Sequence, residues 1–124
     1  MTLEQKILDA WENRALLQET SYQEAIRETI EQLDKGQLRI ANKIGETWQV
    51  QEWVKKAVIL YFPIQKMEVQ EAGILEFFDK IPLKRNYEAL GVRVVPSAVA
   101  RYGAFISAGV ILMPSYVNIG AYID

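Results

Sequence analysis

One arginine of this chain occupies a position where the surrounding pattern predicts an apolar side chain. Arg93 lies six residues before the first member of a series of large apolar residues spaced six apart: Val99, Phe105, Ile111, Val117 and Ile123. A guanidinium in an apolar series needs an anionic partner, and a carboxylate can accept two parallel hydrogen bonds from it. That carboxylate can belong to a bound substrate. It can equally belong to a nearby acid such as Glu88, if Pro96 interrupts the register, and the spacing alone leaves both possibilities open.

A small basic cluster and several polar residues are weaker candidates. Lys80, Lys84 and Arg85 could attract an anionic substrate, but such a cluster more often forms a solvated face, which is the interpretation we favour. Asp79 is either a helix cap or the acid of an ion pair. Asn118 either faces a cleft and binds a ligand or stacks within a β-solenoid. Packing explains the aromatic candidates, with tyrosines between coils or subunits and tryptophans in the core: Tyr116, Tyr122, Trp11, Trp48 and Trp53.

Two residue types that often carry chemistry are missing. The chain contains no cysteine and no histidine, so disulfides, thiol nucleophiles and thiolate metal sites cannot be built from it. A zinc site on three imidazoles and a histidine general base are excluded for the same reason.

Charge and hydropathy restrict the partners and the location. The formal net charge is −2, which argues against non-specific nucleic-acid binding, because that requires a concentrated basic face. The first residues contain acids and no continuous apolar stretch, so we expect a cytoplasmic protein without a secretory signal. Residues 102–123 lack charge and are long enough to span a bilayer. Pro114, Asn118 and the six-residue order argue against a spanning helix, so we expect no membrane contact.

The six-residue period predicts the architecture of the tail. It fits neither a helix nor a simple strand, and it is typical of a hexapeptide-repeat parallel β-helix, in which each face of a triangular coil takes one hexad. The series from Val99 to Ile123 is expected to fill the interior. Four residues after each of its first four members comes a small residue suited to a tight corner: Gly103, Gly109, Ser115 and Ala121.

Upstream patterns predict helices and a short hairpin. Thr2 and Gln5 form a capping box before one helical stripe, and Ser21 with Glu24 repeats the pattern before a second helix that Gly36 ends. A hairpin around Gly45 and a helix over 51–62 follow. Residues 64–90 are difficult to interpret, although three of them are expected to anchor the segment to the core: Phe77, Phe78 and Ile81. The sequence thus predicts an α+β N-terminal domain over residues 1–91 that leads into the first turns of a β-helix over residues 92–124.

Four segments in order resemble the tetrahydrodipicolinate N-succinyltransferases. They are EWVKKAVILYF (52–62), FFDKIPLK (77–84), GVRVVPSAV (91–99) and LMPSYVNIGAYID (112–124). Hexapeptide repeats occur in many acyltransferases, whereas MPSYVNIGAY together with VRVVP is much more specific. The similarity covers most of the chain and is weakest between residues 64 and 73.

The resemblance implies an enzyme of lysine and diaminopimelate biosynthesis. Such enzymes are homotrimers of parallel left-handed β-helices, with active sites between neighbouring subunits. The amine of ring-opened tetrahydrodipicolinate, a small dicarboxylate, attacks the thioester of succinyl-CoA while an acidic side chain assists proton removal. Neither a metal nor an acyl-enzyme takes part.

The resemblance carries one functional residue over to this sequence. Arg93, in VRVVP, matches the arginine that binds a substrate carboxylate. The family's acid–base carboxylates, and most residues that hold coenzyme A, lie beyond the counterpart of Asp124. We therefore expect no catalytic residue within these 124 positions and no activity from them alone, while the sequence leaves open whether the natural chain continues past Asp124. Two alternatives remain: a non-catalytic assembly or binding module, and another hexapeptide acyltransferase that uses a different acyl-CoA.

Overall fold

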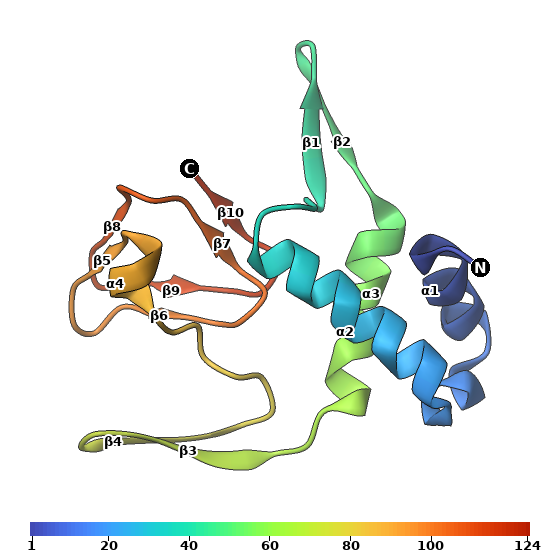
Figure 1. The fold of residues 1–124 in the computed structure, drawn as a ribbon, viewed down its shortest axis with the longest axis horizontal. Coiled ribbons are helices and arrows are strands. Elements are labelled where there is room, and N and C mark those ends of the chain that lie inside the picture. The colour runs from blue at the N-terminus through green and yellow to red at the C-terminus, as the bar shows by residue number, and fades with distance from the viewer.

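The computed structural model describes residues 1–124 and has three parts. Figure 1 shows a group of helices, a short coil of strands beside it, and two hairpins that project from these bodies. The helical unit contains α1 (Leu3–Glu12), a 3₁₀ turn η1 (Arg14–Gln18), α2 (Thr20–Asp34) and α3 (Glu52–Ile64). None of the helices combines the length and the apolar character that crossing a membrane would require.

The helical unit folds around a core of aliphatic side chains. Thr2 accepts a hydrogen bond from the Gln5 backbone while Gln5 reaches back to Thr2, so the capping box is confirmed. The second predicted capping box, Ser21 with Glu24, is wrong, because α2 begins at Thr20 and its N-cap Glu19 makes no side-chain capping bond. One face of each helix contributes to the core, whose largest fully buried aliphatic members are Ile7, Ile26, Ile30, Val54, Leu60 and Ile81.

Two antiparallel hairpins extend from the helices. β1 (Ala41–Ile44) pairs with β2 (Thr47–Val50), so a hairpin around Gly45 is confirmed. β3 (Glu68–Ala72) pairs with β4 (Leu75–Asp79), and this second hairpin was not predicted. Ile81 is fully buried as expected, but Phe78 is 66% exposed, so its predicted anchoring role is wrong.

The tail forms three short parallel sheets. After a one-turn helix α4 (Tyr87–Leu90), six strands of two residues follow: β5 (Arg93–Val94), β6 (Val99–Ala100), β7 (Phe105–Ile106), β8 (Ile111–Leu112), β9 (Tyr116–Val117) and β10 (Tyr122–Ile123). β5 pairs with β8, β6 with β9 and β7 with β10, all in parallel. Each strand therefore lies beside the strand three places later, so the chain completes one turn and stacks a second upon it.

The predicted interior of this coil is wrong in phase at Val99, Phe105 and Ile111, and is confirmed at Val117 and Ile123. The side chains that face inward are Val94, Ala100, Ile106, Leu112, Val117 and Ile123. Ile111 is 55% exposed instead, and Phe105 packs outward beside Gly36. The inward positions are six apart up to Leu112, then five apart to Val117, so one series six apart cannot follow them all. A slip of one residue exchanges the two faces of a strand.

Buried polar contacts join the coil to the helical unit. The Lys84 ammonium donates to Asp34 Oδ1 at 2.9 Å and to the Ala104 carbonyl at 2.7 Å. Asp34 Oδ1 also accepts from the Gly103 backbone N–H at 2.9 Å. The Tyr102 hydroxyl donates to the Glu31 carboxylate. The end of α2 therefore holds the first coil in place through hydrogen bonds as well as apolar contact.

Candidate functional site

Arg93 lies on the outside of the first coil. Its strand pairs with β8, and its backbone N–H donates to the Val110 carbonyl at 3.1 Å. Because the next residue, Val94, faces the interior, the Arg93 side chain points outward, where it is exposed. The prediction that Arg93 replaces an inward apolar residue is therefore wrong, because Val99 and Phe105, the members of that series in the first turn, also face outward.

The guanidinium of Arg93 has no anionic partner within the chain. The three salt bridges of the structure are Lys35–Glu31, Lys84–Asp34 and Arg101–Asp79, so pairing with Glu88 is wrong. Its neighbour across the parallel pair is the half-exposed Ile111, and Met113 is 62% exposed. The coil therefore presents an unpaired cation in a partly apolar surrounding.

The predicted basic cluster separates into two environments. Lys84 is 7% exposed and is bound by Asp34, so a solvated face is wrong for this residue. Lys80 donates to the Phe62 carbonyl at 3.0 Å, while Arg85 is exposed. Both line a pocket of about 320 Å³, together with Arg27 and Lys66.

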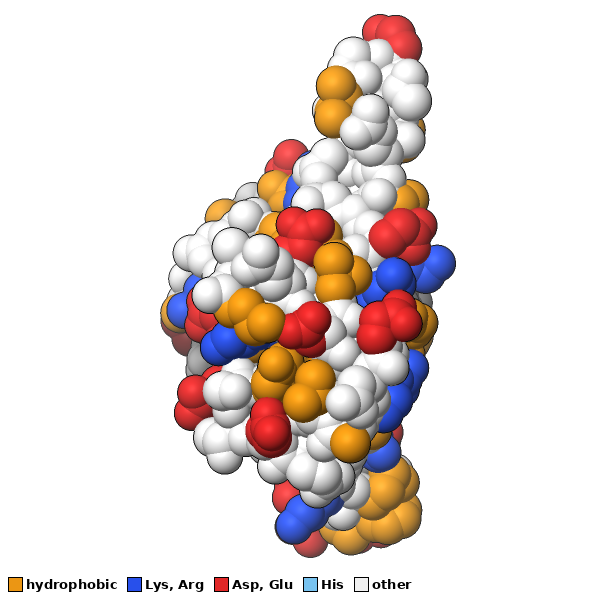
Figure 2. All heavy atoms as spheres, turned by 90° about the vertical axis from the view of Figure 1, so that its right-hand side faces the viewer, with side chains coloured by type: hydrophobic (Ala, Val, Ile, Leu, Met, Phe, Trp, Pro, Cys, Tyr) orange, Lys and Arg blue, Asp and Glu red, His pale blue; other side chains and the backbone are white.

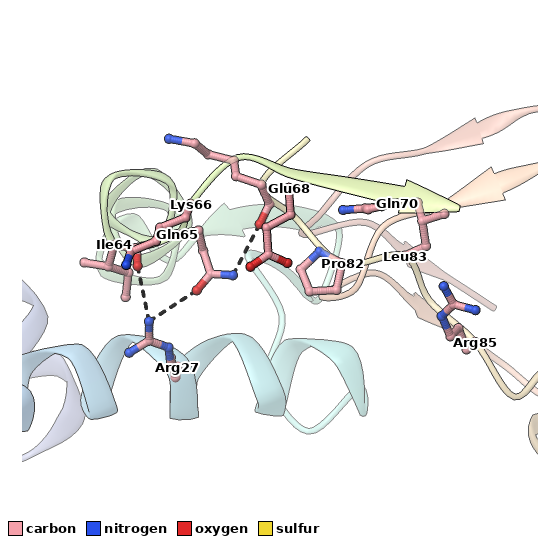
Figure 3. Close-up of a pocket in the computed structure, with 10 residues that line it drawn as sticks. Arg27, Ile64, Gln65, Lys66, Glu68, Gln70, Pro82, Leu83 and Arg85 are labelled. Carbon is pink, nitrogen blue, oxygen red and sulfur yellow. Dashed lines mark hydrogen bonds between the residues drawn. The ribbon is translucent and has the colours of Figure 1, made fainter. Parts of the chain in front are cut away.

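This pocket is basic, but its two arginines do not converge (Figure 3). Arg27 donates to the Ile64 carbonyl and to Gln65 Oε1, both at 3.2 Å. Figure 3 shows Arg27 and Arg85 at opposite ends of the pocket, with Glu68 between them. The pocket can attract an anion by its positive charge, but two donors that lie this far apart are not a bidentate receptor for one carboxylate.

Arg101 organises a second polar group that the sequence did not reveal. It forms a salt bridge with Asp79 at 3.0 Å and donates to Asn118 Oδ1 at 3.2 Å. Asn118 Oδ1 also accepts from the Tyr116 hydroxyl and from the Ile119 backbone. Asp79 is therefore the acid of an ion pair, one of its two predicted roles, and Asn118 is occupied within the coil. The sequence signal for this group is the position of Arg101 directly after Ala100: because Ala100 faces the interior, Arg101 points outward.

The remaining aromatic candidates are structural. Tyr122 packs against Phe105, with ring centroids 4.6 Å apart, which agrees with packing between coils. Trp11 and Trp53 pack partly buried against the helical core, but Trp48 is 57% exposed, so a core role for this residue is wrong.

The contact between Tyr102 and Glu31 changes the pKa of both side chains. Burial raises the pKa of Tyr102 far above its usual range, and the hydrogen bond to the Glu31 carboxylate adds to the effect. That hydrogen bond, followed by the one from Lys35, lowers the pKa of Glu31. The pair is therefore a neutral phenol bonded to a carboxylate at neutral pH, which is a structural arrangement rather than an acid–base pair. No three carboxylates converge in a way that could hold a metal ion.

Comparison with known proteins identifies the family. Residues 2–64 match the model described as "Tetrahydrodipicolinate N-succinyltransferase N-terminal". The chain belongs to this family. The match covers α1, α2, the β1–β2 hairpin and α3, which form the helical unit and its first projection.

Curated relatives extend the similarity over the coil. A 2,3,4,5-tetrahydropyridine-2,6-dicarboxylate N-succinyltransferase of Burkholderia multivorans is 48% identical over 98% of this chain and 48% of its own length. The protein of the same name from Burkholderia cenocepacia is 48% identical over 97% of this chain and 48% of its own. The chain thus spans about half the length of the curated relatives it matches.

Proposed function

We propose that this chain is the N-terminal part of an enzyme that transfers succinyl from succinyl-CoA to the amine of ring-opened tetrahydrodipicolinate. The observation that carries the proposal is the match over nearly the whole chain to proteins named for that activity. The reaction belongs to lysine and diaminopimelate biosynthesis, which takes place in the cytoplasm.

The chemistry divides between this chain and the part that would follow it. The acceptor amine attacks the thioester carbonyl, the carbon–sulfur bond breaks, and the amine proton passes to an acidic side chain as coenzyme A leaves. We assign that acid and most contacts with coenzyme A to residues after Asp124, and no step requires a metal. The 124 residues alone are therefore expected to be inactive.

Within this chain we assign Arg93 to one carboxylate of the acceptor. Its exposure and its lack of an internal partner support the assignment, because an unpaired guanidinium can donate two parallel hydrogen bonds to one carboxylate. The half-exposed Ile111 beside it can cover the methylene groups of the substrate.

We extend the observed coil into a left-handed hexapeptide β-helix, three of which associate as a homotrimer. The support is the parallel stacking of β5–β7 under β8–β10 and the unpaired outer edge of each second-turn strand. An unpaired edge exposes backbone donors and acceptors, which further coils of the same chain would satisfy.

The proposal is tested by the Arg93→Ala substitution in the full-length enzyme. A charge-assisted hydrogen-bonded contact contributes about 1.5–3 kcal/mol, so the KM for the acceptor should rise about ten- to a hundredfold. The KM for succinyl-CoA should not change. Arg85→Ala is a matched control, because Arg85 is also exposed but lies in the basic pocket. An unchanged acceptor KM would remove Arg93 from the site.

The free edges of β8–β10 also favour a second candidate, a non-catalytic assembly module that binds a partner through its last turn. Release of thiol from succinyl-CoA by the full-length protein distinguishes the two functions. Turnover with the acceptor supports the enzyme. No turnover, with a stable complex formed through the last turn, supports the module. An enzyme that prefers another acyl-CoA would show itself in the same assay by its choice of donor.

A further inference from the structure

The β1–β2 hairpin leaves three large apolar side chains exposed. Ile44 and Trp48 are each 57% exposed and Val50 is 52% exposed, and every residue of β2 is exposed. The two strands pair only with each other, and an isolated two-stranded hairpin is marginally stable at best. Figure 2 shows this hairpin standing clear of the body at one end of the molecule, with hydrophobic side chains on it.

The segment that leads into the hairpin follows the outside of the coil turn by turn. Gly36 lies against the Phe105 ring, so closely that a Cβ there would meet it at 2.7 Å. Three residues later, the Arg39 guanidinium stacks 3.7 Å from the centre of the Tyr122 ring. Phe105 and Tyr122 are register partners on β7 and β10. The chain from Gly36 to Arg39 therefore rises by one turn of the coil.

The hairpin continues in the same direction. In Figure 1 it extends upward, to the same side of the coil as the C-terminal end of the chain. Neighbouring strands lie about 4.8 Å apart, and a residue of a strand rises about 3.3 Å. Strands of four residues therefore extend over the height of two to three further coils.

A polar atom at the base of the hairpin lacks a partner. Arg39 Nε is buried and has no hydrogen-bond acceptor. Its guanidinium carbon lies 3.7 Å from the centre of the Tyr122 ring and 5.7 Å from the centre of the Trp48 ring. A buried donor without an acceptor costs stability, so an acceptor is expected from whatever covers this corner. Tyr122 lies on β10, whose second edge is unpaired and is where a further strand would pair.

We infer that the apolar face of the β1–β2 hairpin packs along the outside of the coils that follow Asp124 in the same chain. The face consists of Trp48 and Val50 on one side of β2, with Ala41 of β1 beside them, and the inference rests on the continued coil of the proposed function. The covering residue nearest the base is the outward one on the strand that would stack on β10, 17 or 18 residues beyond Tyr122. A large apolar residue there would continue the outward column of Phe105 and Tyr122. The backbone of the same strand, or a side chain next to it, would accept from Arg39.

The test places the photo-reactive residue p-benzoylphenylalanine at Trp48 in the full-length protein. The inference predicts a cross-link within one chain to the segment about 17 or 18 residues beyond Tyr122, on the evidence of the register pairs. Mixed subunits, isotopically light and heavy, distinguish cross-links within a chain from those between chains. The same label at Glu46, in the exposed turn of the hairpin, should give much less of this product. A cross-link only to another copy, or none, overturns the inference.

A second measurement needs no bulky label. With Trp11→Phe and Trp53→Phe, Trp48 is the only tryptophan in residues 1–124. Any tryptophan after Asp124 is replaced by phenylalanine in the same way. Quenching of Trp48 by acrylamide should fall roughly twofold or more between the 124-residue chain and the full-length protein, because exposed apolar surface becomes covered. Equal quenching in both contradicts the inference. An active succinyltransferase with equal quenching refutes this packing alone, whereas an inactive protein without further hexads refutes the proposed function.

Discussion

The helical unit and the coil keep their shapes by different means. The helical unit surrounds a core of large, fully buried aliphatic residues, such as Ile26, Ile30 and Leu60. The interior of the coil is narrow and includes Ala100 and Ala104, and its strands are two residues long. The helical unit can therefore be stable by its own apolar burial, whereas the coil depends on its links to α2. The proposed substrate residue, Arg93, lies on the dependent part.

The largest effect should come from breaking the buried link between the two regions. Lys84→Ala leaves the Asp34 carboxylate, whose side chain is 18% exposed, without its cation, and loss of one partner of a buried pair costs about 3–5 kcal/mol. Denaturant unfolding of the 124-residue chain measures the change. Because the link holds the coil, near-ultraviolet signals from Tyr102 and Tyr122 should be lost before the helical signal.

Lys35→Ala is the matched control. Lys35 pairs with Glu31 at the same 2.9 Å, but the two side chains are 58% and 39% exposed, and exposed pairs contribute about 0–1 kcal/mol. If both substitutions cost the same, the coil would not depend on the buried link.

A smaller effect should distinguish the two faces of a coil strand. Leu112 is 6% exposed and Ile111 is 55% exposed. Truncating a buried leucine costs about 2–5 kcal/mol, with the lower values where a site can relax, so Leu112→Ala should cost about 2–3 kcal/mol. Ile111→Ala should cost less than about 0.5 kcal/mol. Thermal unfolding of the two variants side by side is the measurement, and the reverse order would restore the phase that the six-residue series predicts.

The smallest effect concerns pH. The hydrogen bond from Tyr102 lowers the pKa of Glu31 in the folded chain, so this bond stabilises above the ordinary glutamate pKa of about 4.3. The stabilisation is lost as the pH falls below that value. The raised pKa of Tyr102 gives the opposite pH dependence of stability. Its stabilisation is complete below the ordinary tyrosine pKa of about 10 and is lost as the pH rises beyond that value.

Tyr102→Phe removes both contributions. It should cost about 1 kcal/mol at neutral pH, the usual contribution of one hydrogen bond, and it should weaken the decline of stability at both ends of the pH range. Urea unfolding at a series of pH values measures this, with Tyr116→Phe, whose residue is 59% exposed, as the control. A profile for Tyr102→Phe that is parallel to the wild type would contradict the assignment.

Local patterns predicted what local contacts determine. The capping box joins Thr2 to Gln5, three residues apart, and the first hairpin turns at Gly45 with a positive φ of 63°, so both were predictable from neighbouring residues. The β3–β4 hairpin was not, because most of its residues are exposed and its sequence shows no clear alternation of apolar and polar residues.

The phase of the coil and the role of Lys84 depend on distant contacts. Strands such as Phe105–Ile106 and Ile111–Leu112 have two apolar residues in succession, so hydrophobicity does not indicate which of them faces inward. The five-residue step before Val117 then makes a single six-residue series match the interior only in its last part. Lys84 is buried because Asp34 reaches it from a helix 50 residues away, which no neighbouring residue indicates. The outward position of Arg93 follows from the same phase.

The most direct test of the coil is a pair of cysteine variants, since the chain has no cysteine of its own. The structure pairs Val99 with Tyr116, both outward, whereas Val117 faces the interior. Strands at this spacing place Cα atoms within the range of about 4.4–6.8 Å that a disulfide requires. The Val99→Cys/Tyr116→Cys variant should lose its free thiols on mild oxidation, and the Val99→Cys/Val117→Cys variant should keep them. The opposite result would contradict the register, and with it the outward position of Arg93.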